Sequence, residues 1–290
     1  MQFLASALEN SWHIIRSGSP FGKWNVLRTY WKIKAMHAFA FKLLRIRPTQ
    51  TTIFGHMIHF YHLPTFIGLF EEIIIKNEYA TPLNTTKRTI LDCGANIGIA
   101  SLYFYMCNPE AQITSFEPSS INFKILSKNL PFPDRVVLVN KAVGKESGQR
   151  SFYFDANNVN MGMSSLLKER QKKVSAVETV ECTPLSHYIT SEIDLLKLDV
   201  EGAEQEVLEE IVESGKIKMI REMMVEYHHH ILYEDTLSKF LLILEKNGFG
   251  YHIKKLGSGS GTIPVFQDIL LYIYRKDILP HTTYDDSARI

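Results

Sequence analysis

The sequence predicts an α/β fold built on a doubly wound, mostly parallel sheet of seven strands, with an antiparallel terminal hairpin and an N-terminal helical extension. From about residue 88 onward, short apolar runs alternate with helical segments, as in parallel sheets covered by helices on both faces. The last two apolar runs are joined by LGSGSGTIPVFQ without a helix, which favours antiparallel pairing. A chain of 290 residues with 45% apolar composition can bury the core that such a domain needs.

The elements follow in order along the chain. Residues 1–80 are expected to form the helical and hairpin extension, and residues 81–290 the main domain. The stretch from Trp24 to Ile46 lacks Gly and Pro and favours a helix, and TTIFGHMIHFY alternates like a hairpin around Gly55. We expect strands near 89–92, 112–116, 136–139, 194–199, 218–226, 249–254 and 268–275, and helices near 97–107, 119–129, 203–213 and 235–247. Residues 148–183 interrupt this alternation and indicate an inserted hairpin with an Asn/Gly/Ser-rich loop near the ligand edge of the sheet.

Composition narrows the class of protein. The net charge of +1 argues against a generally basic nucleic-acid-binding protein. Three cysteines without a CxxC pair suit a reducing compartment. The first residues lack the basic start and apolar core of a signal peptide, and no apolar run approaches the roughly 20 residues of a membrane span. These features together predict a cytoplasmic protein.

The charge is distributed unevenly. No Asp or Glu lies between Asn10 and Phe70, whereas eight basic residues and all three tryptophans do: Arg16, Lys23, Arg28, Lys32, Lys34, Lys42, Arg45, Arg47, Trp12, Trp24 and Trp31. A basic helix that carries tryptophan can lie on an anionic membrane surface or receive an acidic substrate. A lid over the main domain, or the interface of a homodimer, explains the same residues. Peripheral membrane contact through residues 10–70 therefore stays one of three alternatives.

The stretch ILDCGANIGIAS combines a buried strand, a glycine turn and a helix start, an arrangement that cradles nucleotide-like ligands. A dinucleotide fingerprint needs glycines at positions 96 and 99, which here are Asn96 and Ile99. The spacing instead fits S-adenosylmethionine (SAM). Gly94 would let the backbone approach the ligand, Asn96 tolerates a left-handed turn, and Gly98 lets the next helix pack closely. Asp92 at the strand end would hold either the turn or the ammonium of the ligand, whose carboxylate would face the helix N-terminus.

The next two strands supply the other cofactor candidates. Glu117 ends the second strand, where a carboxylate can accept both ribose hydroxyls of the cofactor. The alternative for Glu117 is an acid that caps the following helix. Asn140 and Ala142 follow the third strand, where the adenine should lie.

Several stretches, in this order, resemble the FkbM family of SAM-dependent methyltransferases: ILDCGANIG, SFEPSSINFKILSKN, VNKAVG, MSSL and DLLKLDVEGAEQEVLE. The segment EEIIIKNEY, with Tyr79, resembles the part of the family that precedes its first strand. The resemblance covers roughly residues 60–275 but not residues 1–50. It implies a class I methyltransferase fold, SAM as the methyl donor, and oxygen methylation of sugars, glycans or natural-product hydroxyls.

Candidates for the chemistry follow the fourth and fifth strands. A neutral hydroxyl is a poor nucleophile at pH 7, so a base or a metal ion should assist methyl transfer to it. Asp199, Glu226 and His228 are expected to converge as a base with its orienting acids, or Asp199 and Glu226 to bind a divalent cation such as Mg²⁺. Glu201 is a substrate-binding candidate, although it and Glu204 also suit a helix start. Ser164 and Ser165 would bind substrate or cap their loop.

Three functions compete at this point. The favoured one is a methyltransferase that acts on a hydroxyl of a sugar, glycan or glycolipid. Motifs of DNA amino-methylating and cytosine-C5 enzymes are absent, so nucleic acid is an unlikely substrate, but ribose methylation of RNA remains open through the basic N-terminal region. The third is a SAM-binding protein without catalysis, although acids remain at the strand ends where catalytic groups are needed.

Overall fold

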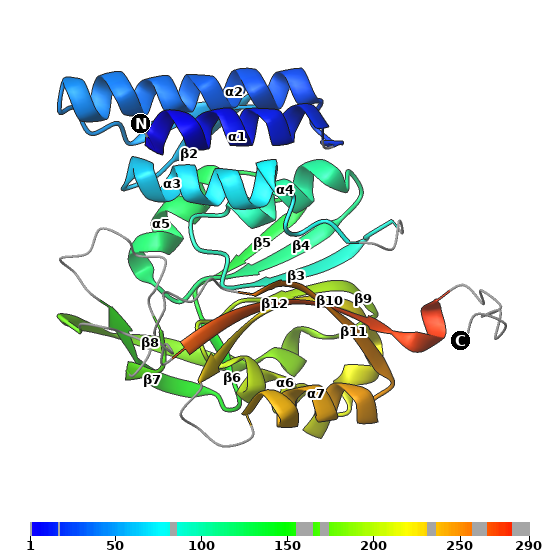
Figure 1. Cartoon of the computed structure of the whole chain (residues 1–290). Coiled ribbons are helices and arrows are strands. Elements are labelled where there is room, and N and C mark those ends of the chain that lie inside the picture. Colours follow the sequence, from blue (N-terminus) through cyan, green and yellow to red (C-terminus); the bar gives the residue numbers. More distant parts are fainter. Residues whose placement is uncertain are drawn as a thin grey trace, which may run out of the picture.

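The computed structural model describes residues 2–16, 18–81, 86–154, 165–168, 174–230, 236–256 and 266–279. Its centre is a seven-stranded sheet in the order β11-β12-β10-β9-β3-β4-β5 (Figure 1). The strands are β3 (Thr89–Cys93), β4 (Gln112–Phe116), β5 (Val136–Val139), β9 (Ile193–Leu198), β10 (Ile220–His230), β11 (Phe249–Leu256) and β12 (Phe266–Arg275). β12 pairs antiparallel with β10 and β11, and the other neighbours are parallel. The predicted sheet and its terminal hairpin are confirmed.

Strand β10 differs from its expected bounds at both ends. It begins at Ile220 because Lys216–Met219 forms a short 3₁₀ helix, and it runs four residues beyond the expected end, to His230. Its parallel pairing with β9 stops at Val225, whereas its antiparallel pairing with β12 continues to His230. Residues 226–230 therefore project beyond the carboxyl end of β9 on a two-stranded ribbon, which carries Glu226 and His228.

Helices cover both faces of the sheet (Figure 1). On one face lie α4 (Ile99–Cys107) and α5 (Ser120–Asn129), and on the other α6 (Glu204–Glu213) and α7 (Thr236–Lys246). Side chains alternate between the two layers along each strand. In β3, Ile90 belongs to the core under α4 and α5, and Leu91 belongs to the core under α6 and α7. The near-continuous apolar strands of the sequence reflect burial on both faces.

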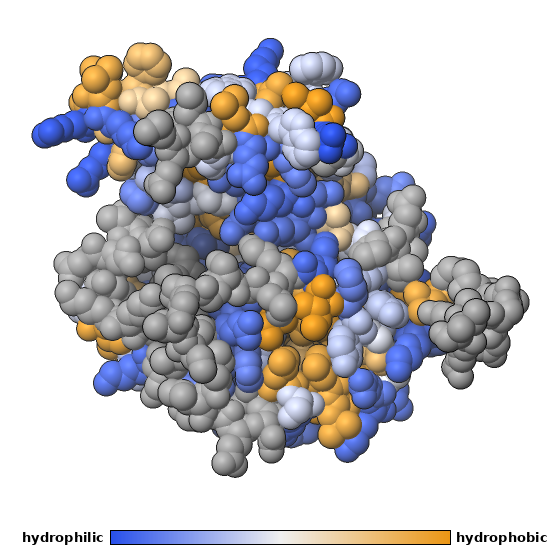
Figure 2. Space-filling model, in the orientation of Figure 1, coloured by the Kyte–Doolittle hydropathy of each residue, from blue (hydrophilic) through white to orange (hydrophobic). Residues whose placement is uncertain are grey.

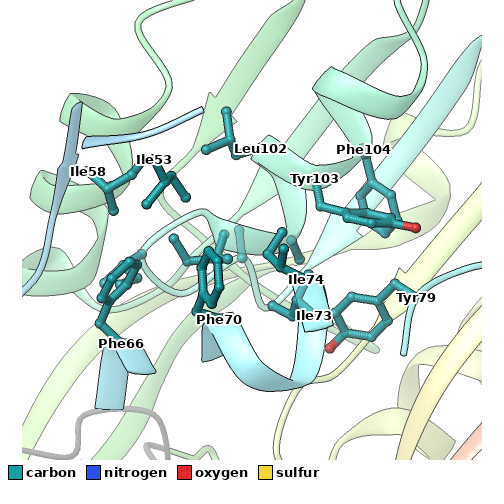
Figure 3. Packing of buried hydrophobic residues seen from close by; sticks show 14 of the residues in the cluster. Ile53, Ile58, Phe66, Phe70, Ile73, Ile74, Tyr79, Leu102, Tyr103 and Phe104 are labelled. Atoms are coloured by element: carbon teal, nitrogen blue, oxygen red, sulfur yellow. The ribbon is translucent and has the colours of Figure 1, made fainter. Parts of the chain in front are cut away.

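The N-terminal region adds a further layer over α4 and α5. It contains α1 (Gln2–Arg16), α2 (Lys23–Met36), a π-helical segment η1 (His37–Leu43), the hairpin β1 (Gln50–Ile53) and β2 (His56–His59), α3 (Leu63–Leu69) and a π-helical segment η2 (Phe70–Ile75). The helix expected over residues 24–46 thus changes to π-helical geometry after Met36, and the hairpin at Gly55 is confirmed. Phe66, Phe70 and Ile73 pack toward Leu102 and Phe104 of α4 (Figure 3). This layer shares one hydrophobic core with the sheet.

A small second sheet, in the order β6-β8-β7, flanks the large one. It consists of β6 (Ala142–Gly144), β7 (Gly148–Phe154) and β8 (Ala176–Pro184). A short 3₁₀ turn at Leu185–Tyr188 follows β8, and another at Lys276–Ile278 follows β12 of the large sheet. The antiparallel pair β7–β8 confirms the hairpin expected within residues 148–183. The polar loop expected there, including Ser164, falls largely on residues 155–164, outside the described residues. Among the described helices, none is long and apolar enough to cross a membrane.

Candidate active site

A pocket opens at the carboxyl ends of β3, β4 and β9, where a parallel sheet of this type binds ligands. It encloses about 790 Å³ of empty space, part of which is open to solvent, a size that suits a nucleoside-like ligand. Its walls come from the glycine turn after β3, from the N-terminal layer through Leu69, Ile73 and Tyr79, and from the second sheet through Phe152. The N-terminal layer therefore forms one wall of the pocket.

The turn after β3 has the predicted left-handed backbone. Gly94, Asn96 and Gly98 have φ angles of 82°, 52° and 90°. A Cβ on Gly94 would lie 1.8 Å from the carbonyl oxygen of Asp199, so the backbone that follows β9 requires glycine there. A Cβ on Gly98 would lie 2.8 Å from Leu126 of α5, which explains the close packing expected after this residue.

A buried lysine that the sequence analysis did not single out holds this turn to β9. The ammonium of Lys197 donates to the carbonyl oxygen of Gly94 at 2.7 Å and lies 3.4 Å and 3.3 Å from the carboxylates of Asp92 and Asp199. Burial by itself lowers the pKa of Lys197, but the two carboxylates raise it well above the ordinary value. Lys197 lines the pocket, whereas Asp92 is fully buried behind it and accepts from Ser101. Asp92 thus holds the turn rather than reaching the pocket.

Glu117 lies in the pocket wall and braces the same turn. Its two carboxylate oxygens accept the backbone N–H groups of Asn96 and Ser119, each at 2.9 Å. Burial raises the pKa of Glu117 to about 7, although these two N–H groups lower it. Each carboxylate oxygen can accept a second hydrogen bond, so the contact with ribose hydroxyls remains open to it. The cap of α5 is Ser119, whose hydroxyl accepts from the N–H of Asn122.

The two adenine candidates differ in position. Ala142 is buried and lines the pocket between Lys141 and Val143. The side-chain amide of Asn140 donates to the carbonyl oxygens of Glu117 and Pro118, at 2.8 Å and 3.1 Å, and Asn140 is not among the pocket-lining residues. Its contact with adenine therefore stays a prediction, and its observed contacts fix the backbone after β4.

The catalytic candidates gather around His228, beside the pocket. Ligand atoms of Asp199, Glu201 and His228 all lie within 4.8 Å of one another, and Asp199 and Glu201 also line the pocket. His228 Nε2 lies 3.3 Å from Glu201 Oε2, and His228 Nδ1 lies 2.9 Å from Glu204 Oε1. The group expected from Asp199 and His228 is thus assembled, but Glu204 supplies the close contact that orients the imidazole.

Glu204 is buried at the start of α6 and stays ionised. Its Oε1 atom also accepts the backbone N–H groups of Val200 and Gly202, at 3.1 Å and 3.0 Å. Burial by itself raises the pKa of Glu204, but the neighbouring His228 and these hydrogen bonds lower it below the ordinary value. An ionised carboxylate accepts but does not donate, so His228 Nδ1 carries the shared proton and Nε2 faces the cluster.

Glu226 lies close enough to the same cluster for the charges there to change its pKa. Burial and the carboxylates of Asp199, Glu201 and Asp268 together raise the pKa of Glu226 to about 8, against the lowering effect of His228. Glu226 is therefore largely protonated at neutral pH. The candidate cation ligands that lie together are Asp199, Glu201 and His228, a set that differs from the expected pair of Asp199 and Glu226.

Glu201 and Ser165 are coupled. The Ser165 hydroxyl donates to the carbonyl oxygen of Glu201 at 2.5 Å and accepts from the N–H of Leu167 at 2.9 Å. Ser165 is fully buried, so these contacts favour the loop-capping alternative over direct contact with substrate. Glu201 has a φ of 57°, a left-handed conformation that a non-glycine residue adopts only when its surroundings hold it. Ser165 helps to hold Glu201 toward His228.

Comparisons with known proteins identify the family of this chain. A family model described as the methyltransferase FkbM domain matches residues 92–275. The chain belongs to the FkbM methyltransferase family. It is accordingly a SAM-dependent methyltransferase, as the motifs from ILDCGANIG to DLLKLDVEGAE indicated.

Individual relatives share this domain. Methyltransferase sdnD of Sordaria araneosa is 29% identical over 192 residues, which cover 54% of this chain and 73% of that protein. The 2-O-methyltransferase NoeI of Sinorhizobium fredii is 26% identical over 180 residues, which cover 56% of this chain and 72% of that protein. Among solved structures, the methyltransferase FkbM of Methylobacillus flagellatus KT is similar at 14% identity and a TM-score of 0.45, over 91% of this chain and 58% of that one.

The position of Glu117 predicts a pH-dependent cofactor affinity. Because the pKa of Glu117 is about 7 and the ionised carboxylate is the stronger acceptor, SAM should bind more tightly as the pH rises through 7. Glu117→Ala should weaken SAM binding by about 1.5–3 kcal/mol, and Glu117→Gln should remove the pH dependence. Calorimetric titration with the demethylated product, S-adenosylhomocysteine, measures both effects.

The matched control is Glu110→Ala, because Glu110 is an exposed acid just before β4. Unchanged affinity in both Glu117 variants would exclude the ribose contact.

Proposed function

We propose that this methyltransferase transfers the methyl group of SAM to a hydroxyl of a sugar, glycan or glycolipid. The observation that carries the proposal is the cluster of carboxylates around His228, which joins the pocket through Asp199 and Glu201. A base at this position would speed methyl transfer to an alcohol acceptor. The name of the relative NoeI, a 2-O-methyltransferase, supports oxygen as the methylated atom.

The pocket residues would hold SAM as follows. Glu117 would accept the ribose hydroxyls, Ala142 and Val143 would border the adenine, and Lys197 and Tyr79 would border the methionine part. When bound, SAM supplies an electrophilic methyl group on a positively charged sulfur. The carboxylates of Asp199 and Glu201, which also line this pocket, place negative charge near that sulfonium.

His228 would act as the base. In the neutral form of His228 the Nδ1 proton points to Glu204, so Nε2, which lies 3.3 Å from Glu201 Oε2, is the nitrogen that would accept a proton from the acceptor hydroxyl. Loss of this proton would make the acceptor oxygen nucleophilic enough to take the methyl group, with S-adenosylhomocysteine as the leaving group. The imidazolium that results lies between the carboxylates of Glu204 and Glu201, which stabilise its charge.

The surrounding acids suit a polyhydroxylated acceptor. Asp199, Glu201 and Glu226 offer oxygens that can accept hydrogen bonds from hydroxyls next to the one that is methylated, and a sugar ring presents such neighbouring hydroxyls. A flat aromatic acceptor would offer fewer hydroxyl groups to these half-buried oxygens. This distribution of polar groups favours a carbohydrate.

A divalent cation is the second candidate for activating the hydroxyl. Asp199, Glu201 and His228 offer two oxygens and one nitrogen within 4.8 Å of one another, and a cation held there would lower the pKa of a bound hydroxyl. The two versions make opposite demands on His228: as a metal ligand it cannot also take the proton. Dialysis against EDTA separates them, because activity that is lost in EDTA and restored by Mg²⁺ requires the metal version.

The acceptor class is tested with labelled SAM. The protein is incubated with a panel of oligosaccharides, glycolipids and RNA, and methylated products are identified by mass spectrometry. Methyl groups on sugar hydroxyls of the first two classes are the expected result. Methylation of RNA ribose alone would replace the carbohydrate assignment, and binding of SAM without transfer to any acceptor would favour the non-catalytic alternative.

A further inference from the structure

The end of η1 and the residues after it carry apolar side chains on the surface. Phe39, Leu43, Leu44 and Ile46 are 64%, 69%, 62% and 55% exposed. Single exposed apolar residues are common, but four within eight consecutive positions form a patch of the kind that marks an interaction site. We call residues 39–47 the apolar-basic segment.

Basic residues are interleaved with these apolar side chains. Lys42, Arg45 and Arg47 are exposed in the same segment. Figure 2 shows hydrophobic and hydrophilic groups side by side along the N-terminal layer, the part of the molecule farthest from α6 and α7 (Figure 1). Long cationic side chains beside leucine and isoleucine match a boundary between charged headgroups and acyl chains.

Helices α1 and α2 also carry exposed tryptophans that lie beside basic side chains. Trp12 and Trp24 are 57% and 67% exposed. The guanidinium of Arg16 lies 3.8 Å from the centre of the Trp12 ring, and the ammonium of Lys23 lies 5.8 Å from that of Trp24. Exposed tryptophan next to a cation is typical of protein surfaces that sit at the headgroup level of a bilayer.

No acidic side chain lies among these residues. The sequence has no Asp or Glu from residue 10 to residue 70. The next acid, Glu71, is directed inward, where it accepts from the Tyr30 hydroxyl at 2.8 Å and pairs with Lys34 at 3.3 Å. The three basic residues of the apolar-basic segment thus have no acid within the same stretch of sequence, and the exposed Glu9 lies on α1. This local excess of positive charge favours an anionic partner.

This charge also distinguishes between possible occupants. A symmetric dimer formed through the apolar-basic segment would place Lys42, Arg45 and Arg47 of one copy against the same residues of the other, which is repulsive. Single-stranded RNA would use aromatic platforms for its bases, whereas three of the four exposed apolar side chains of the apolar-basic segment are aliphatic. An anionic lipid surface can contact both kinds of side chain in the segment: its acyl chains the apolar ones and its phosphates the basic ones.

We propose that residues 39–47 attach the protein to the surface of an anionic membrane, with Phe39, Leu43, Leu44 and Ile46 in the headgroup–acyl boundary and the three basic side chains at lipid phosphates. Attachment of this kind does not require a spanning helix. It is independent of which acceptor the active site methylates.

The experiment is co-sedimentation of the full chain with vesicles of phosphatidylcholine alone or with 30% phosphatidylserine, at about 50 and 500 mM salt. We expect sedimentation only with the anionic vesicles and mainly at low salt. The triple variant Lys42→Gln/Arg45→Gln/Arg47→Gln should reduce partitioning by about 10²-fold, at roughly fivefold for each charge. Leu43→Ser/Leu44→Ser should also reduce partitioning onto the vesicles, because the apolar side chains contribute to binding as well as the basic ones.

The matched control, Lys216→Gln/Lys218→Gln/Lys246→Gln, removes the same charge from the opposite side of the sheet. It should sediment like the wild type. Equal loss in this control would assign the binding to net charge and overturn the proposal, as would no sedimentation of the wild type at low salt. A dimer in light scattering that Leu43→Ser/Leu44→Ser dissociates would assign the segment to a second copy instead. Circular dichroism checks that the variants are folded.

Discussion

His228→Ala is expected to lower turnover by about 10²-fold or more while SAM still binds with nearly wild-type affinity. The alanine side chain cannot take the proton of the acceptor hydroxyl, and His228 is not among the residues that line the cofactor pocket. Methyl transfer at saturating SAM, together with calorimetry of S-adenosylhomocysteine binding, measures the two effects separately. Near-normal turnover would sink the assignment and leave positioning of the substrate to explain the rate.

The run of three histidines supplies the matched control. His229 follows His228 on β10 but points to the other side, where its ring stacks with Tyr227 at 6.4 Å between ring centres. His229→Ala should therefore keep turnover within about twofold of the wild type.

Glu204→Gln tests whether Glu204 orients the imidazole of His228. It should lower kcat and shift the pH profile of turnover, because the neutral amide fixes the Nδ1 proton of His228 less firmly than the carboxylate does. A Glu204→Gln enzyme with an unmoved pH profile would mean that Glu204 serves only the fold.

Lys197→Met is expected to lower the free energy of unfolding by about 3–5 kcal/mol. Removal of the ammonium leaves the fully buried carboxylate of Asp92 without its cation. Asp92 Oδ1 has no hydrogen-bond partner among the described residues, so the ion pair with Lys197 at 3.4 Å is its main compensation. Urea denaturation followed by circular dichroism gives the value.

A double-mutant cycle identifies the cause. If loss of the ion pair is responsible, Asp92→Asn combined with Lys197→Met should be less destabilised than the two single changes add up to, because the double variant buries no unpaired charge. Simple additivity would contradict this explanation. Lys197→Met should also weaken SAM binding, since the same ammonium holds the carbonyl oxygen of Gly94 in the cofactor turn.

The sequence by itself determined the strands of the sheet and the glycine turn after β3. Both depend on local patterns: seven apolar runs, most of them alternating with helices, set the order of elements, and the left-handed positions after β3 suit Gly94, Asn96 and Gly98. Glu117 was identifiable for the same reason, because the end of a strand can be read from the residues on either side of it. Lys197 could also have been identified from the sequence, because it is the one charged residue within the apolar run LLKL.

Only the tertiary structure decided which groups meet. Glu204 looked like an ordinary helix-start acid until the fold placed it 2.9 Å from His228, which is 24 residues away in the chain. Strand β10 extends beyond its expected end because β12 continues to pair with it. That pairing places His228 beyond the carboxyl end of β9. Gly94 proved to be required by the backbone of Asp199 on a neighbouring strand. Local propensity fixes how each segment begins and ends, whereas these contacts depend on distances between segments that only the packed sheet sets.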